Sequence, residues 1–186
     1  MQKPRGKLRK PAPEALQALG AFEAAAVMGV HYATPAKMAQ KGLIVCRTVP
    51  LSGGIKSAPI FDGRSCEEDY LDYEEKLAEG GSGKRPRGYL DLRPEALKRL
   101  RAVETPITFA DAITTAEAAE ILSVHTSFIA RMIAAGDIVG RRLWSPRGGA
   151  GERIYIVSRA SCVANAQKAR REQAAGGKVG RPRKFS

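Results

Sequence analysis

The chain has 186 residues, with 31 lysines and arginines against 19 aspartates and glutamates, and a net charge of +12. Apolar residues make up 44 % of it, which is enough for a core in one or two small domains. Eight of the acidic residues lie between Asp62 and Glu79, so the rest of the chain is more basic still. Such a charge points to a polyanionic partner.

Several classes of protein are not expected from the sequence. It has no apolar run of about 18 residues, the length that a transmembrane helix needs. Cys46, Cys66 and Cys162 never form a CxxC pair, and reduced thiols in the cytoplasm are expected. No catalytic constellation, nucleotide-binding glycine loop or metal-ligand spacing is present, so we expect no enzyme, cofactor or metal.

Taken in order, the chain starts with a basic, proline-rich arm at residues 1–12, which we expect to be disordered or to follow DNA. A first domain is predicted over residues 13–79. A helix is expected to begin near Pro13, with Leu16 and Leu19 facing inward.

Residues 23–44 recur at 117–138 with a constant offset of 94. Such ungapped identity at structural positions indicates an internal duplication. The identical pairs are Glu23/Glu117, Ala24/Ala118, Ala25/Ala119, Val30/Val124, His31/His125, Met38/Met132, Gly42/Gly136 and Ile44/Ile138, followed by Arg47/Arg141 and Ile60/Ile154.

The first copy departs from the second in its second helix. Pro35 is tolerated only in a first helical turn, so this helix is predicted to be short, with Thr34 as its N-cap. A hairpin with prolines at 50 and 59 follows, which is typical of edge strands. An acidic helix at 66–79 is then expected to pack between domains or to dimerise, with Tyr70, Leu71, Tyr73 and Leu77 as its apolar residues.

Residues 80–93 are predicted to be a basic, glycine- and proline-rich linker. A turn and helix, opened by Pro94, with Leu97, Leu100 and Val103 on one face, lead into the second domain, at 94–173. A basic tail covers 174–186.

The second copy, from Thr114 to Ile138, has the pattern of two short helices joined by a tight turn, the helix-turn-helix that reads DNA. Val124 is expected to fill the gap between the helices, and Gly136 to end the second helix in a left-handed conformation. The predicted inward residues are Ala118, Ala119, Ile121, Leu122, Phe128, Ile129, Met132 and Ile133. A basic hairpin and a helix capped by Ser158 follow, with Ala160 and Val163 facing inward.

This stretch resembles the helix-turn-helix domain shared by excisionases and MerR-type regulators, over about residues 113–170. The residues that fit the family pattern are Glu117-Ala118-Ala119, Leu122, Val124, Ser127, Ile129, Arg131, Met132, Ile133, Gly136 and Ile138, and Arg153-Ile154-Tyr155-Ile156 fits the end of its hairpin wing. The expected fold is mainly α with small β-hairpin wings (α+β), as two winged helix-turn-helix-like domains in tandem, the first one degenerate.

The helix at 125–135 is expected to enter the major groove of double-stranded DNA. The predicted base-reading residues are His125, Thr126, Ser127 and Arg131. The predicted phosphate-binding residues are Arg141, Arg142, Arg147 and Arg153 in the second copy and Lys37, Lys41 and Arg47 in the first.

The tail resembles an AT-hook, a short peptide whose arginines lie in the narrow minor groove of A·T-rich DNA. The residues that carry this resemblance are Lys178, Gly180, Arg181, Pro182, Arg183 and Lys184, and Arg85 and Arg87 in the linker form a partial match.

The sequence leaves the use of DNA binding open. A transcriptional regulator of a bacterial or mobile-element operon ranks first, and an excisionase-like recombination accessory or a nucleoid-associated protein is the alternative. RNA binding is a further alternative. A homodimer, and a recombinase or RNA polymerase as partner, are compatible with the sequence, and a cytoplasmic (nucleoid) location is expected.

Overall fold

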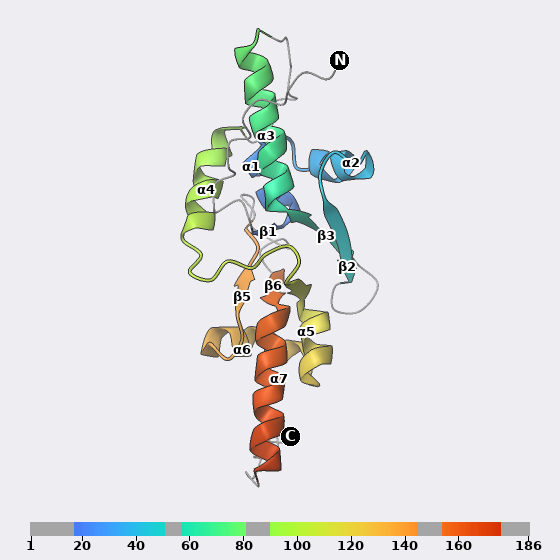
Figure 1. Cartoon of the computed structure of the whole chain (residues 1–186), viewed down its shortest axis with the longest axis vertical. Coiled ribbons are helices and arrows are strands. Elements are labelled where there is room, and N and C mark those ends of the chain that lie inside the picture. The colour runs from blue at the N-terminus through green and yellow to red at the C-terminus, as the bar shows by residue number, and fades with distance from the viewer. Residues whose placement is uncertain (1–16, 51–56, 81–89, 145–153, 176–186) are drawn as a thin grey trace, which may run out of the picture.

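The computed structural model describes residues 17–50, 57–80, 90–144 and 154–175 and shows a mixed α+β protein (Figure 1). The first unit consists of β1 (Ala18–Leu19), α1 (Ala21–Met28), α2 (Thr34–Gln40), β2 (Cys46–Pro50), β3 (Ser57–Asp62) and α3 (Gly63–Ala78). The second consists of β4 (Ala112–Thr114), α5 (Thr115–Leu122), α6 (Thr126–Ala135), β5 (Gly140–Arg142), β6 (Tyr155–Ser158) and α7 (Arg159–Ala174). Between them lie the 3₁₀ turn η2 (Leu90–Leu92) and the helix α4 (Arg93–Arg101).

The two units have the same order of elements and the same sheet topology. Each antiparallel sheet places the last strand of its unit in the middle, in the orders β1-β3-β2 and β4-β6-β5. Pro59 therefore lies in a central strand, not in an edge strand as predicted. Because β1 pairs only with Phe61 and Asp62, the missing amide of Pro59 interrupts no ladder on that side.

Equivalent hydrogen bonds recur in both units. The carboxylates of Glu23 and Glu117 accept from the backbone amides three residues earlier, at the starts of α1 and α5. The hydroxyls of Ser65 and Ser161 accept from the amides of Val45 and Val139 at the starts of α3 and α7. These serines are 96 residues apart and the glutamates 94, so the second hairpin is two residues longer.

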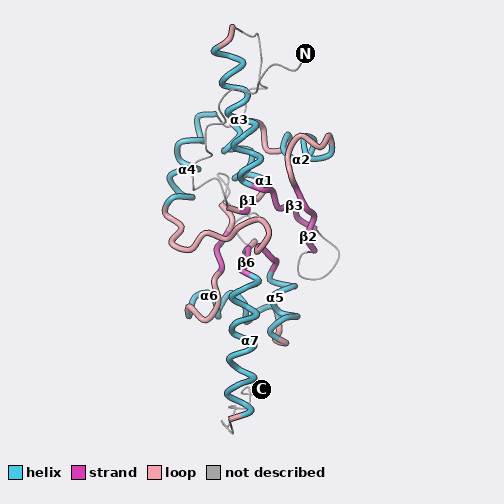
Figure 2. Tube along the Cα trace, viewed as in Figure 1, coloured by secondary structure: helices cyan, strands magenta, loops and turns pink. Residues whose placement is uncertain are grey.

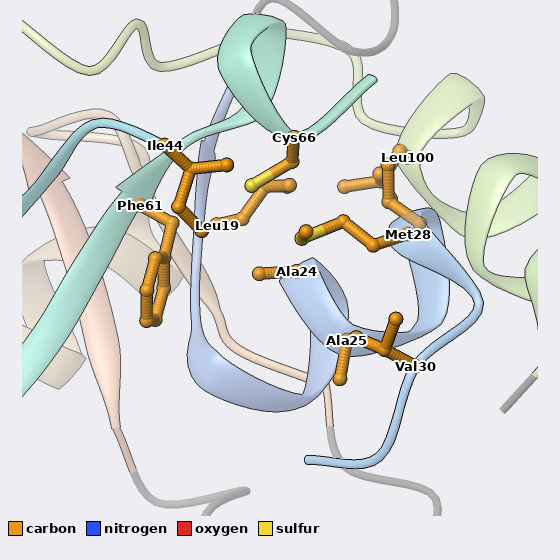
Figure 3. Close-up of a cluster of buried hydrophobic side chains, with 10 residues drawn as sticks. Leu19, Ala24, Ala25, Met28, Val30, Ile44, Phe61, Cys66 and Leu100 are labelled. Carbon is orange, nitrogen blue, oxygen red and sulfur yellow. The ribbon is translucent and has the colours of Figure 1, made fainter. Parts of the chain in front are cut away.

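The first unit has a small apolar core in which α1 lies between α3 and α4 (Figure 3). Leu19, Met28, Phe61, Cys66 and Leu100 are among its buried residues. Leu19 lies in β1, not in a helix as predicted, and Leu16 is outside the described residues.

The helix α4 packs on the first unit, although it lies within the range predicted for the second domain. The Arg93 guanidinium donates to both carboxylate oxygens of Glu67 at 2.8 and 2.9 Å and to the carbonyl of Val27. It also lies 3.5 Å from the centre of the Tyr70 ring. Pro94 stands in the first turn of α4, as predicted.

Several predicted side-chain positions are wrong. The N-cap of α2 is Ala33, and Thr34 is its first residue. Val124 and Phe128 are 37 % and 42 % exposed instead of buried. In α7, whose Ser158 cap is confirmed, Cys162 is buried while Ala160 and Val163 are exposed.

At one equivalent pair of core positions, the two units differ in which side chain is the larger, the one on the strand or the one on the helix. In the second unit, Gly140 lies so close to Ile133 that an added Cβ would meet its Cγ1 at 2.7 Å and its Cδ1 at 2.5 Å. The equivalent residues 94 positions earlier are Cys46 and Ala39, which pack against the core of the first unit. A side chain on the strand is thus compensated by a smaller one on the helix.

We predict that Gly140→Ala lowers the free energy of unfolding by about 1–3 kcal/mol, because the new methyl group overpacks against Ile133. Adding Ile133→Ala should restore part of this loss, since the pair then matches the arrangement of the first unit. Urea denaturation of both single variants and the double variant measures the coupling. Additive losses would contradict this packing account.

Candidate nucleic-acid interface

The helices α5 and α6 form a compact pair with a three-residue connection. Their axes are bent by 89° across residues 123–125. Ser123 adopts a left-handed conformation with φ 54°, and the Val124 amide donates to the carbonyl of Ala119. This crossing angle and turn length are those of a helix-turn-helix.

Both ends of α6 are set by its sequence. His125 is its N-cap, and Nδ1 of the ring accepts from the amide of Ser127 at 3.3 Å. The same nitrogen lies 2.8 Å from the Ser127 hydroxyl. Gly136 ends the helix with φ 77°, as predicted. His125 was predicted to read bases. In the structure its ring instead caps the start of α6 and so helps to position this helix.

The outer face of α6 carries both polar and aromatic side chains. Ser127 and Arg131 are exposed and Thr126 is half-buried, whereas Ile129 is fully buried. The Arg131 guanidinium lies 5.8 Å from the ring centre of Phe128. The sequence analysis did not predict that Phe128 lies on this outer face, because its apolar character suggested the core. Its place one helical turn before Arg131 is the signal in the sequence that could have shown this.

Arg141 does not extend toward solvent. Its Nη1 and Nη2 bind the two carboxylate oxygens of Glu23 in the first unit, at 2.6 and 3.0 Å, and Nη2 also donates to the carbonyl of Ala18. The side chains of Arg141 and Glu23 are only 11 % and 3 % exposed. The Trp144 amide donates to the same carboxylate. A structural role between the units therefore replaces the predicted phosphate contact of Arg141.

The hairpin of the second unit is thus docked on the first unit instead of projecting as a free wing. A buried apolar cluster joins the two sheets. It contains equivalent residues from each unit, Ala18, Val49 and Ile60 with Ala112, Leu143 and Ile156, together with Ile107. The amide of Ala18 donates to the carbonyl of Ile107, and Gln17 pairs with Thr108.

The remaining predicted phosphate-binding residues of the described chain differ in accessibility. Arg47 lies 5.5 Å from the ring centre of Phe109, and its Nε and Nη2 are buried without a hydrogen-bond partner, which does not favour the predicted contact. Arg142 is exposed and donates to the Tyr155 hydroxyl at 2.8 Å. Lys37 and Lys41 are exposed, and Lys37 stands at the position equivalent to Arg131.

Other predicted DNA contacts lie outside the described residues: Arg85 and Arg87 in the linker, Arg147 and Arg153 in the hairpin, and Lys178, Gly180, Arg181, Pro182, Arg183 and Lys184 in the tail.

The described thiols have the environment of structural residues. Burial raises the pKa of the Cys66 thiol far above its usual value, and burial also raises the pKa of Cys46 and of Cys162. Within the described ranges, no three histidine, cysteine or acidic side chains converge as metal ligands.

Comparison with protein-family models, curated proteins and solved structures finds no match. No single helix in the described part of the chain is long and apolar enough to cross a membrane. The helices α5 and α6 reach that length and composition only when taken together across their bend.

We predict that Arg141→Ala lowers the free energy of unfolding by about 3–5 kcal/mol, because it leaves the buried Glu23 carboxylate without its cation. The matched control is Arg64→Ala, which removes an exposed pair with Glu68 on α3. That pair should contribute only about 0.3–0.5 kcal/mol. Guanidinium denaturation measures both variants, and similar small losses would contradict the proposed importance of the buried pair.

Proposed function

We propose that this chain binds double-stranded DNA through α6, as a helix-turn-helix protein with two units of the winged helix-turn-helix kind in tandem. The observation that carries this proposal is the 89° helix pair whose second member turns Ser127, Phe128 and Arg131 outward while Ile129 anchors it to the core. A helix held in this way can enter the major groove with its N-terminal residues at the base edges.

The side chains of α6 suit base recognition. The Arg131 guanidinium can donate two parallel hydrogen bonds to the O6 and N7 atoms of guanine. Phe128 beside it offers an apolar surface for a thymine methyl group. Ser127 and Thr126 can donate or accept, and they discriminate less. His125 fixes the start of the helix, so its contribution to recognition is positional.

Phosphate contacts supply affinity without sequence information. Lys37 and Lys41 in the first unit and Arg142 in the second are exposed cations suited to this role. Arg147 and Arg153 in the hairpin and the AT-hook-like residues of the tail remain proposed contacts on their sequence alone. Among the uses of such binding, a transcriptional regulator ranks first.

The test is fluorescence anisotropy with A·T-rich and G·C-rich duplexes and a set of sequence variants, at two salt concentrations. Salt-sensitive binding supports the proposal, since each neutralised phosphate steepens the salt slope by about 0.9. A chain truncated after residue 175 reports whether the tail adds A·T preference. Absence of binding at low salt would refute the proposal.

We predict that Arg131→Ala reduces discrimination between the preferred and the altered duplex by about 1–3 kcal/mol, because a bidentate base contact is lost. Lys41→Ala should weaken binding to all duplexes equally and reduce the salt slope by about one. The matched control is Lys98→Ala, an exposed cation on α4. Equal losses on every duplex for both Arg131→Ala and Lys41→Ala would refute this division of roles.

A further inference from the structure

The surface around α2 in the first unit has apolar side chains at two positions where the second unit has polar ones. We define the α2 surface as Tyr32, Lys37, Lys41, Leu43 and Val45, of which the three apolar residues are 41 %, 60 % and 51 % exposed. The residues of the second unit equivalent to Tyr32 and Leu43 are Thr126 and Asp137. Val45 corresponds to Val139, so the comparison distinguishes only Tyr32 and Leu43. Because the fold is the same in both units, folding alone does not require these two exposed apolar side chains, and such side chains mark contact surfaces.

A second apolar feature of the first unit runs along α3. Cys66, Tyr70, Tyr73 and Leu77 follow a spacing of four, three and four residues, which places them in one stripe on the helix. The stripe is buried at Cys66 and Tyr70, but Leu77 is 44 % exposed. The free end of α3 extends past the other labelled elements of the first unit (Figure 2).

The equivalent stripe on α7 lacks this apolar character. With the offset of 96 residues that relates the two helices, its members are Cys162, Ala166, Ala169 and Gln173. The helix α7 extends at the opposite end of the molecule and shows that a projecting helix in this position needs no large apolar side chains (Figure 1). The exposed end of the α3 stripe is therefore a feature of the first unit alone.

The two features have opposite charges. The helix α3 contains six acidic residues against two basic ones, and Glu74 lies one turn before Leu77. Carboxylates near a helix C-terminus are locally unfavourable because they face the negative end of the helix dipole. The α2 surface contains the exposed Lys37 and Lys41, which stand between Tyr32 and Leu43 in the chain. The end of α3 and the α2 surface are thus complementary in charge, and both expose apolar side chains.

We propose that two copies of this chain form a dimer through their first units, with the free end of α3 from each copy against the α2 surface of the other. Both surfaces belong to the same unit at the same end of the molecule (Figure 1). A two-fold axis therefore lets each copy give α3 and receive its partner's α3, so the contact is made twice and closes. The contact buries Leu77 with Leu43 and pairs the acidic helix with the lysines.

This dimer uses Lys37 and Lys41, so in the dimer these two lysines face the partner's α3 in place of the phosphates proposed for them above, and DNA contact rests on α6 and Arg142. The dimer leaves α6 uncovered in both copies, because α6 lies toward the opposite end of the molecule from the free end of α3 (Figure 1). Two helix-turn-helix units would then be carried by one assembly. The experiment is made without DNA, so its failure does not affect the proposed function.

The first test gives each residue of the first unit the identity found at the equivalent place in the second. We predict that Leu43→Asp and Leu77→Gln each weaken the dimer about tenfold, as expected when one leucine is removed from an interface. Sedimentation equilibrium of the full chain measures the dissociation constant. The matched control is Val163→Gln, which removes an apolar side chain that is 39 % exposed on α7 and should leave the constant unchanged.

A mixing experiment identifies the occupant as a second copy. Lys37→Glu and Glu74→Lys should each weaken self-association, whereas a one-to-one mixture of the two variants should restore dimers, because each contact in the mixed dimer pairs opposite charges. Thermal unfolding followed by circular dichroism checks that both variants are folded. A wild-type chain that stays monomeric at low salt, or a dimer unaffected by Leu43→Asp and Leu77→Gln, would overturn the proposal.

Discussion

The buried pair between Glu23 and Arg141 determines how the two units are arranged. The Glu23 carboxylate accepts from the start of its own helix at Gly20, from both terminal nitrogens of Arg141 and from the amide of Trp144. A buried carboxylate must be satisfied in this way, since an unpaired one is strongly unfavourable. The hairpin of the second unit is consequently held against α1, and the apolar residues of both sheets meet beside it. The strands of this hairpin thus connect the two units and are not free as a wing would be, and the DNA binding that we propose is left to α6 and to residues away from this contact between the units.

Because the two units share one fold, differences between equivalent residues show which residues the fold itself requires. Equivalent positions keep the capping bonds at the starts of α1 and α5 and of α3 and α7, because the first amides of a helix need partners. They also keep the bonds from the amides of Val45 and Val139 to the hydroxyls of Ser65 and Ser161. Other positions exchange roles. Gly20 is the residue equivalent to Thr114 of the second unit. A side chain is excluded there because a Cβ at Gly20 would lie 2.8 Å from Cδ1 of Leu143 in the second unit. Arg47 and Arg141 are equivalent in sequence, yet Arg141 has the Glu23 carboxylate while Arg47 lies over an aromatic ring. Such differences mark the positions at which equivalent residues have different structural roles in the two units.

The surfaces of the units have diverged further than their cores. The outer face of α6 carries serine and arginine, and α7 ends in basic residues, which suits the approach of a polyanion. The first unit instead presents an acidic α3 and the apolar α2 surface, which suits contact with protein. The two proposals therefore place DNA at one end of the molecule and a second copy at the other, and repulsion keeps the acidic helix α3 away from phosphate.

Several features could be predicted from the sequence: the repeat, the two short helices on either side of residues 123–125, the ends of α6, the cap of α7 and the basic balance of the chain. These features depend on neighbouring residues: spacing of apolar side chains, a glycine after a last turn, a hydroxyl before a first turn. The accessibility of the arginines, in contrast, depends on contacts between distant parts of the chain. Arg141 and Arg142 are adjacent and chemically identical, but strand alternation sends Arg141 to Glu23, more than one hundred residues earlier in the chain, and Arg142 to solvent. The same holds for α4, because the residues that it packs against come from the arrangement of whole elements and leave no local signal in the sequence.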